Sequence, residues 1–459
     1  MAPVIDNVVR RSFDPGAPSD AFRSQWKHPG DIFTLLLIIG GDVVARALAQ
    51  LAGSPITPVA FSFGWVAYAA AAVVSAVGEN KLMPLPDCDC QVINGKSGYV
   101  RSNTSWVIGR IVRDFESWMD RSDPSGRVRA QVDKMLRDRW EYDKAQAEKA
   151  EPGAGARVEK PVQAGLCVSI YQPGQATKGY PGYDLVYWMG FATAILQLGI
   201  AAIPCGLFGD WGILLITIAG ILLSFATGSL PQWRAEKWAC RQNSTKSVIL
   251  TKGNGSQHAI VIVGNGKGLD LEDLAAGQTN VNFSASWDTR AWTLILATLW
   301  ILLLITAGGL SRNTWFLLAI GGIGILQNVF VAGFRRFPEA YGIPLTLENV
   351  IGSPKVMETL YAVEEQYPRI GASMRATFFP GDLRPDEEEK WQRFADKAKA
   401  QKNRREQTRE NHNDNALAGA SRKVADDDKG GNKTTVTIKA GDKTADSNSG
   451  DDSNQRAGA

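Results

Sequence analysis

Two long apolar runs joined by a short loop dominate the hydrophobic pattern between Leu185 and Leu230. Each run is long enough to cross about 30 Å of hydrocarbon at about 1.5 Å per helical residue. Neither run has the polar stripe that a helix on the surface of a soluble protein would show. The pattern therefore predicts a pair of transmembrane helices.

Four further apolar segments form two similar pairs, one before and one after this hairpin. The first pair covers residues 32–53 and 58–78, and the last covers residues 291–310 and 315–334. Only a few residues separate the two segments of a pair, whereas long polar stretches separate the pairs. The predicted fold class is therefore an α-helical polytopic membrane protein with six transmembrane helices arranged as three hairpins.

The polar stretches predict small folded units. An Asn-Gly turn after Gln91–Asn94 and another at Asn254-Gly255 are signals for β-hairpins, and residues 166–172 form a strand-like run. A charged helix is expected from about Asp386, followed by a tail too polar to fold. The predicted order is an N-terminal tail (1–31), a first transmembrane hairpin (32–78), an α+β insert (79–184), a second hairpin (185–230), a β-rich insert (231–290), a third hairpin (291–334), a helical segment (335–385) and a charged, largely disordered C-terminal tail (386–459).

The distribution of basic residues predicts which side of the membrane the polar parts occupy. The short loops inside the three hairpins contain one basic residue, Arg312, whereas the opposite flanks of the spans contain roughly a dozen. By the positive-inside rule, both termini and both inserts are expected in the cytosol. The first thirty residues have no apolar stretch with a small-residue cleavage site, so a cleaved signal peptide is not expected.

Composition narrows the possible partners. A net charge of +3 over 459 residues argues against a nucleic-acid partner, because such proteins are usually far more basic. Five cysteines, an odd number in a long chain, do not form a disulfide framework and fit a reducing compartment. The expected partners are the lipid bilayer and cytosolic proteins that bind the inserts or the tail.

Asp42 and Arg46 are the charged residues predicted to lie near the middle of a span. Each costs roughly 2.5–3.5 kcal/mol at the centre of a membrane helix. Their spacing of four residues places them on one helical face, where they can neutralise each other. They are candidates for a substrate or proton pathway, and the alternative is a structural pair that fixes how the first helix packs.

Gln197, Gln327 and Asn328 are uncharged polar residues in otherwise apolar spans. Hydrogen bonds between helices, worth roughly 1 kcal/mol or less each, are favoured over ligand contacts for these three side chains. Gly321, Gly322 and Gly324 favour close packing of helices.

Other motifs are weak. The glycines of Gly264-x-Gly266-x-Gly268 follow a strand-like run, but their spacing matches neither the dinucleotide nor the P-loop pattern, so a simple turn is favoured. Residues 87–90, Asp-Cys-Asp-Cys, lack a second cysteine pair with which to hold a metal. No Ser-His-Asp or His-Glu-x-x-His arrangement is visible in the sequence. We therefore predict no catalytic residue, no cofactor and no metal site.

Several stretches resemble a family of multi-span membrane proteins from filamentous fungi. They include GGDVVARALAQLAG, TPVAFSFGWVAYA, SLPQWRAEKWACR and GNGSQHAIVIVGNGKGLDLEDLA. The resemblance covers most of the chain up to about Trp391. It implies a eukaryotic host, and because that family has no assigned activity it supplies no catalytic residues.

The sequence favours a membrane scaffold or sensor that presents a cytosolic module to partners. The alternative is a transporter or channel-like protein that uses Asp42 and Arg46 inside the bundle. A membrane-bound enzyme is the least favoured hypothesis, because its site would have to be assembled within the cytosolic inserts.

Overall fold

The computed structural model describes residues 30–400 except 80, 153, 278–282 and 311. The chain divides into two compact units, 1–394 and 395–459. The fold below is that of the first unit. The predictions for the N-terminal tail and for disorder beyond residue 400 fall outside the described residues, whereas the charged helix expected from about Asp386 is present over residues 385–400.

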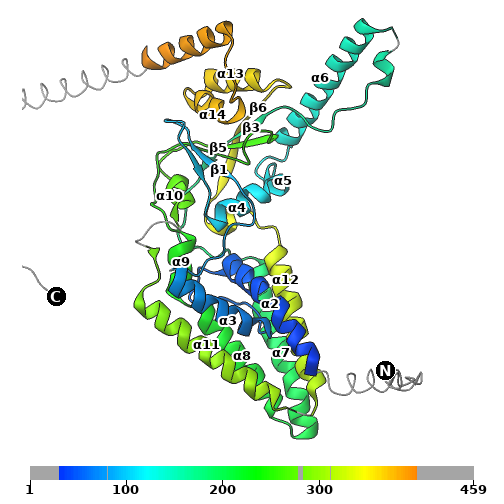
Figure 1. The fold of residues 1–459 in the computed structure, drawn as a ribbon, viewed down its shortest axis with the longest axis vertical. Helices are drawn as coiled ribbons and strands as arrows, with labels where there is room; N and C mark the ends of the chain where they lie inside the picture. Colours follow the sequence, from blue (N-terminus) through cyan, green and yellow to red (C-terminus); the bar gives the residue numbers. More distant parts are fainter. Residues whose placement is uncertain (1–29, 80, 153, 278–282, 311, 401–459) are drawn as a thin grey trace, which may run out of the picture. The chain divides into compact units, whose positions relative to one another are not determined.

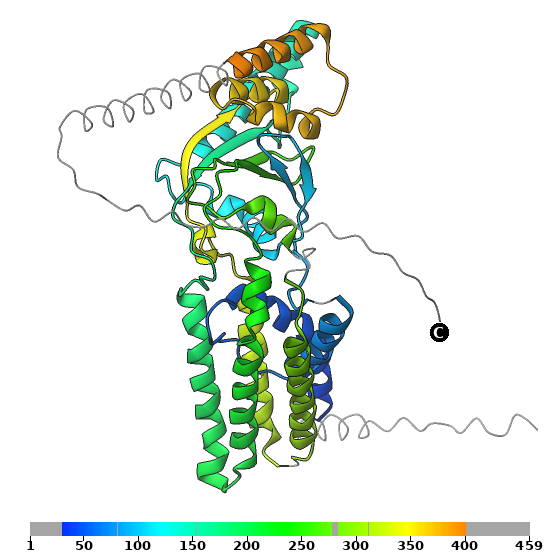
Figure 2. The same ribbon diagram turned by 90° about the vertical axis from the view of Figure 1, so that its left-hand side faces the viewer.

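A bundle of helices holds most of the apolar sequence (Figure 1). Among the described residues, three helices, α7, α11 and α12, are long and apolar enough to cross a membrane, and α8 reaches that length only together with α9 (Pro231–Lys237), across a bend of 42°. Figure 2 shows α7, α8, α11 and α12 running side by side. The bundle comprises α2 (Gly30–Leu51), α3 (Gly64–Val74), the π-helical turn η1 (Ser75–Glu79), α7 (Leu185–Phe208), α8 (Gly212–Gly228), α11 (Trp287–Gly308) and α12 (Thr314–Gly333). This is the architecture of a helical membrane protein.

The first predicted hairpin has a different structure from the one expected. Residues 32–53 lie largely within α2, but residues 55–63 form no helix, and α3 has only 11 residues. The prediction of one continuous helix over residues 58–78 is therefore wrong. Hydropathy failed here because it reports apolar side chains and does not report whether the backbone between them is helical.

The polar segments join in one mixed sheet of six strands in the order β2-β1-β4-β5-β3-β6. All neighbouring pairs are antiparallel except β3 and β5. Both predicted hairpins and the predicted strand near Cys167 are confirmed, while β6 lies in a segment expected to be helical. The strands are β1 (Gln91–Asn94), β2 (Val100–Ser102), β3 (Cys167–Pro173), β4 (Val248–Thr251), β5 (His258–Ile262) and β6 (Leu345–Gly352).

Both faces of this sheet are covered. Alternate residues such as Ile93, Ile249 and Val261 pack against α13 (Val356–Gln366) and α14 (Ile370–Phe378). Their neighbours Val92, Leu250 and Ile260 belong to the core on the other face, as the period of two along a strand requires. That core includes α4 (Trp106–Arg113), α5 (Phe115–Trp118) and α10 (Leu271–Ala275). The sheet and these helices are called the sheet module below.

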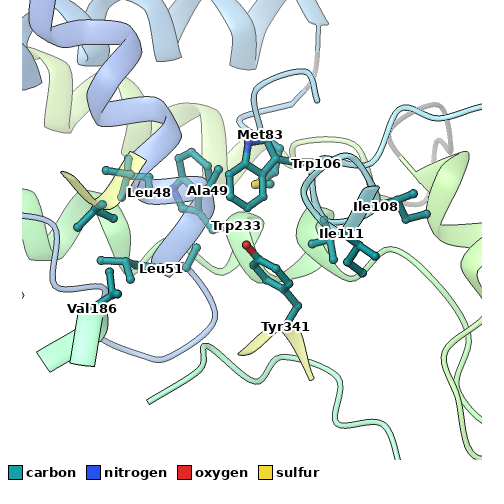
Figure 3. Close-up of a cluster of buried hydrophobic side chains, with 14 of the residues drawn as sticks. Leu48, Ala49, Leu51, Met83, Trp106, Ile108, Ile111, Val186, Trp233 and Tyr341 are labelled. Carbon is teal, nitrogen blue, oxygen red and sulfur yellow. The ribbon is translucent and has the colours of Figure 1, made fainter. Parts of the chain in front are cut away.

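The bundle and the sheet module share one buried apolar cluster (Figure 3). It brings together side chains of α2, α4 and α9 with Tyr341 of the 3₁₀ turn η5 (Pro338–Tyr341). The labelled members include Leu48, Ala49, Leu51, Trp106, Ile108, Ile111, Trp233 and Tyr341. Because the cluster is continuous, the module is packed directly onto the bundle.

Two buried basic side chains close the end of α2 at this junction. Lys237 Nζ donates to the carbonyls of Gln50 (3.0 Å) and Ala52 (2.9 Å). Arg336 donates to the carbonyl of Gln50 (2.8 Å) and, through Nε, to the carboxylate of Asp184 (2.8 Å). The last carbonyls of a helix lack intrahelical donors, so the hydrogen bonds from Lys237 and Arg336 satisfy groups that would otherwise be buried without a partner.

Candidate functional site

Residues 54–63 form no helix, and residues 57–63 of this stretch are buried in the interior of the bundle. At the start, Thr57 Oγ1 donates to the carbonyl of Gly228, at the end of α8 (2.8 Å). The chain then turns into α3 at Gly64, whose backbone lies against that of Gly40 on α2. We call residues 54–79 the re-entrant segment, because of the path described next.

The re-entrant segment returns to the end of the bundle at which it entered. After η1, the backbone N–H groups of Leu82 (2.9 Å) and Met83 (2.7 Å) donate to the carboxylate of Glu236. Glu236 lies on α9, only eight residues after Gly228 in the sequence. The segment therefore begins and ends beside the α8–α9 junction.

Polar side chains from two neighbouring helices satisfy the backbone of the re-entrant segment. Gln197 Nε2 on α7 donates to the carbonyl of Phe61 (2.7 Å), and Asn328 Nδ2 on α12 donates to the carbonyl of Ala60 (3.0 Å). Trp65 Nε1 donates to the same Ala60 carbonyl (2.9 Å). Gln197 and Asn328 are fully buried. An unpaired carbonyl in hydrocarbon costs several kcal/mol, so these bonds permit non-helical backbone inside the bundle.

Glycines on the surrounding helices make room for this backbone. A Cβ on Gly324 of α12 would overlap the carbonyl oxygen of Phe61, and a Cβ on Gly190 of α7 would overlap that of Pro58. On Gly220 of α8 it would overlap the ring of Phe61. The close packing predicted for the glycines of α12 is confirmed at Gly324 and at Gly321, where a Cβ would overlap the ring of Phe63. It is wrong for Gly322, where a Cβ would meet none of the described atoms, and the packing partner is an extended segment and not a helix.

Aromatic rings fill the space beside the re-entrant segment. The ring of Trp300 on α11 stacks on Phe61, with centroids 6.1 Å apart, and on Trp65, at 5.4 Å. All three side chains are almost completely buried. Trp300 also donates from Nε1 to Thr227 Oγ1 (3.3 Å), which holds its ring in place. The interior of the bundle at this level is therefore packed.

Gln327, the third polar residue expected in the spans, does not share in this network. Its side chain is buried, and its Nε2 makes no hydrogen bond within the described part of the chain. The carboxamide oxygens of Gln197 and Asn328 likewise find no donor among the described residues. The two interior amides therefore act mainly as donors to the re-entrant backbone.

Asp42 and Arg46 lie elsewhere. Arg46 Nε donates to Asp42 Oδ2 (2.9 Å), which confirms the predicted contact along the helix. Their side chains are 70% and 42% exposed for Asp42 and Arg46, respectively. The pair is thus on the outer surface of α2, and the structure does not bring it together with Gln197 or Asn328.

The weaker motifs have ordinary structural roles. The Gly264-Gly268 stretch forms a turn in which Asn265 Nδ2 donates to the carbonyl of Pro173 (2.7 Å). Asp87 pairs with Arg113 (2.8 Å), and burial raises the pKa of the Cys90 thiol to about 12, so that it stays protonated. Among the described residues, no group of three or more His, Cys, Asp or Glu side chains could hold a metal ion.

Sequence reasoning missed the partners that complete the site, chiefly Thr57, Glu236 and Trp300. Only the polar interruptions at Gln197 and Asn328 signalled that something other than lipid or apolar side chains lies beside α7 and α12. No family model, curated protein or solved structure matches the chain.

Gly324 and Gly322 provide a test of the fit around the re-entrant segment. In a helix, replacing glycine by alanine normally stabilises by about 1 kcal/mol. We expect this gain for Gly322→Ala, since a Cβ there meets open space, and a loss of stability for Gly324→Ala, since its Cβ would displace Phe61. The unfolding midpoint in detergent measures both changes. Stabilisation by both substitutions would contradict the described path.

Proposed function

We propose that the chain crosses the membrane five times, through α2, α7, α8, α11 and α12, and that the re-entrant segment enters and leaves from one side. The 22 residues of α2 span about 33 Å, enough for the hydrocarbon core. Non-helical backbone at membrane depth is tolerated where protein buries it, which supports this assignment. The proposal replaces six spans in three hairpins.

Five crossings also change which side of the membrane the N-terminus is expected to occupy. Basic residues at the junction, including Lys237, Arg335 and Arg336, support a cytosolic sheet module. An odd number of crossings then puts the N-terminus on the opposite side from the module, in place of two cytosolic termini. Arg23 and Lys27 in the N-terminal tail favour a cytosolic N-terminus by the positive-inside rule, so a direct measurement of the side on which the N-terminus lies distinguishes the two arrangements.

Glycosylation in cells tests the sidedness. Val9→Thr creates a sequon at Asn7, and the natural sequon Asn254-Gly255-Ser256 in the sheet module is the internal control. We expect a glycosidase-sensitive mobility shift only in the Val9→Thr variant, because Asn7 alone would face the lumen. A shift that is already present in the parent chain and disappears with Asn254→Gln would refute the assignment.

We further propose that the protein is a membrane-anchored scaffold that presents the sheet module to partners. The observation that carries this proposal is the packed interior, where Phe61, Trp65 and Trp300 occupy the level at which a pathway would run. The continuous junction between bundle and module also supports it, since the bundle then holds the module in a fixed position.

An exposed helix of the module is the surface best suited to partners. In α6 (Arg127–Ala150), 24 residues long, only Val128 and Met135 are buried. Its outer half packs mainly on the turn η2 (Ala154–Arg157) that follows it, with Trp140 Nε1 donating to the carbonyl of Val158 (2.9 Å). The side chains of α6 that face away from the rest of the module are largely polar and exposed, which suits them to binding a polar protein surface.

Replacing residues 137–161 with a short Gly-Ser linker tests the scaffold proposal. We expect membrane insertion and the unfolding midpoint to change little, because this stretch contributes little to either core, and we expect a defined set of neighbours in proximity labelling to be lost. An unchanged set of labelled neighbours would count against α6 as the binding surface.

Transport remains the second candidate, favoured by the non-helical backbone inside the bundle, a feature found along transporter and channel pathways. Purified protein in proteoliposomes separates the two functions. The scaffold proposal requires no flux above empty vesicles for a panel of ions and metabolites. A selective flux that responds to Phe61→Ala would replace it with transport.

A further inference from the structure

The charged pair on α2 occupies an unusual place for a membrane helix. Asp42 and Arg46 form an ion pair on the outer face of α2, and the half-buried Ala45 lies beside them on the helix surface. On the opposite face, Val44, Ala47 and Leu48 are completely buried against the bundle. The charges therefore point away from every described helix of their own chain.

The depth of the pair follows from two fixed points on α2. Leu51 ends the helix at the junction with the sheet module, and Gly40 lies against the turn of the re-entrant segment inside the bundle. At about 1.5 Å per residue, Arg46 is about 7 Å and Asp42 about 13 Å from the end of α2. Given the five-crossing arrangement proposed above, on which this inference rests, both side chains lie within hydrocarbon.

Such a pair is only partly compensated within one chain. The bond between Arg46 Nε and Asp42 cancels the net charge, but the remaining guanidinium nitrogens and carboxylate lone pairs face lipid. A charged residue inside a membrane helix raises the free energy of insertion. Polar groups in spans usually face protein for this reason, so a partner on this face would stabilise the helix.

We propose that a second copy of this chain covers this face, with α2 packed on α2 around a two-fold axis. A two-fold interface brings one surface patch against itself, so residue i meets residue j and j meets i. Because the patch carries one acid and one base, Asp42 of each copy can bind Arg46 of the other. The small side chain of Ala45, beside the pair, permits close approach of the two helices.

Complementary charge reversal tests this interface. Asp42→Arg makes the face wholly basic, and Arg46→Asp makes it wholly acidic. Two differently tagged copies of one chain are co-expressed in membranes, and the amount of one copy recovered with the other is measured. We expect the parent protein to capture itself, and we expect the amount captured by each single variant to be at least ten-fold lower. Co-expression of Asp42→Arg with Arg46→Asp should restore capture, because opposite charges then face each other.

A crosslink covers the case in which a charge-reversed chain fails to insert. In a variant without the native cysteines, Ala45→Cys should form an intermolecular disulfide on oxidation in membranes, whereas Ala202→Cys, exposed on α7, should not. The dimer would be overturned if either single variant captured itself as well as the parent protein does, or if the mixed pair showed no recovery. It would also be overturned if chains shown to be inserted gave no Ala45 crosslink. A monomeric parent protein in which an anionic lipid or another protein covers this face of α2 would also contradict the dimer. The Asn7 glycosylation measurement reports separately on the five crossings.

Discussion

The bundle depends on satisfying a stretch of backbone that is not helical. Residues 57–63 lack the repeating backbone hydrogen bonds of a helix, and no water is present in hydrocarbon to replace them. Gln197 and Asn328 supply donors to the carbonyls of Phe61 and Ala60 from two different helices. Gly190, Gly220 and Gly324 leave the space that lets these groups meet. The polar and the small residues of the spans thus serve one purpose.

The same requirement governs the end of α2. Its last carbonyls are buried beneath the sheet module, where Lys237 and Arg336 donate to them. Arg336 also binds Asp184, the N-cap residue of α7, and it lies in the chain that leads from α12 to the sheet module. Arg110 of α4 donates to the carbonyl of Ala332 on α12 (2.5 Å), so a polar contact as well as apolar packing holds the sheet module on the bundle.

Local patterns in the sequence were sufficient for elements that depend on nearby residues. The apolar runs indicated α7, α8, α11 and α12, and Asn-Gly turns indicated two hairpins of the sheet. Strand β6 was missed, because its partner β3 is far away in the sequence. The re-entrant segment was missed for a similar reason. Its stability comes from Gln197, Asn328 and Glu236, which no local pattern connects to residues 54–83. The candidates Gln197 and Asn328 were identified as polar side chains in need of a partner, but the partner itself was not predictable.

Labelling from one side of the membrane tests the path of the re-entrant segment most directly. In a chain without native cysteines, Ile56→Cys and Glu79→Cys place exposed thiols at its two ends. In sealed vesicles of known orientation, we expect a membrane-impermeant maleimide to label both thiols from the side of the sheet module and neither from the other side. Labelling of the two positions from opposite sides would mean that residues 56–79 cross the membrane, and would contradict the structure proposed here.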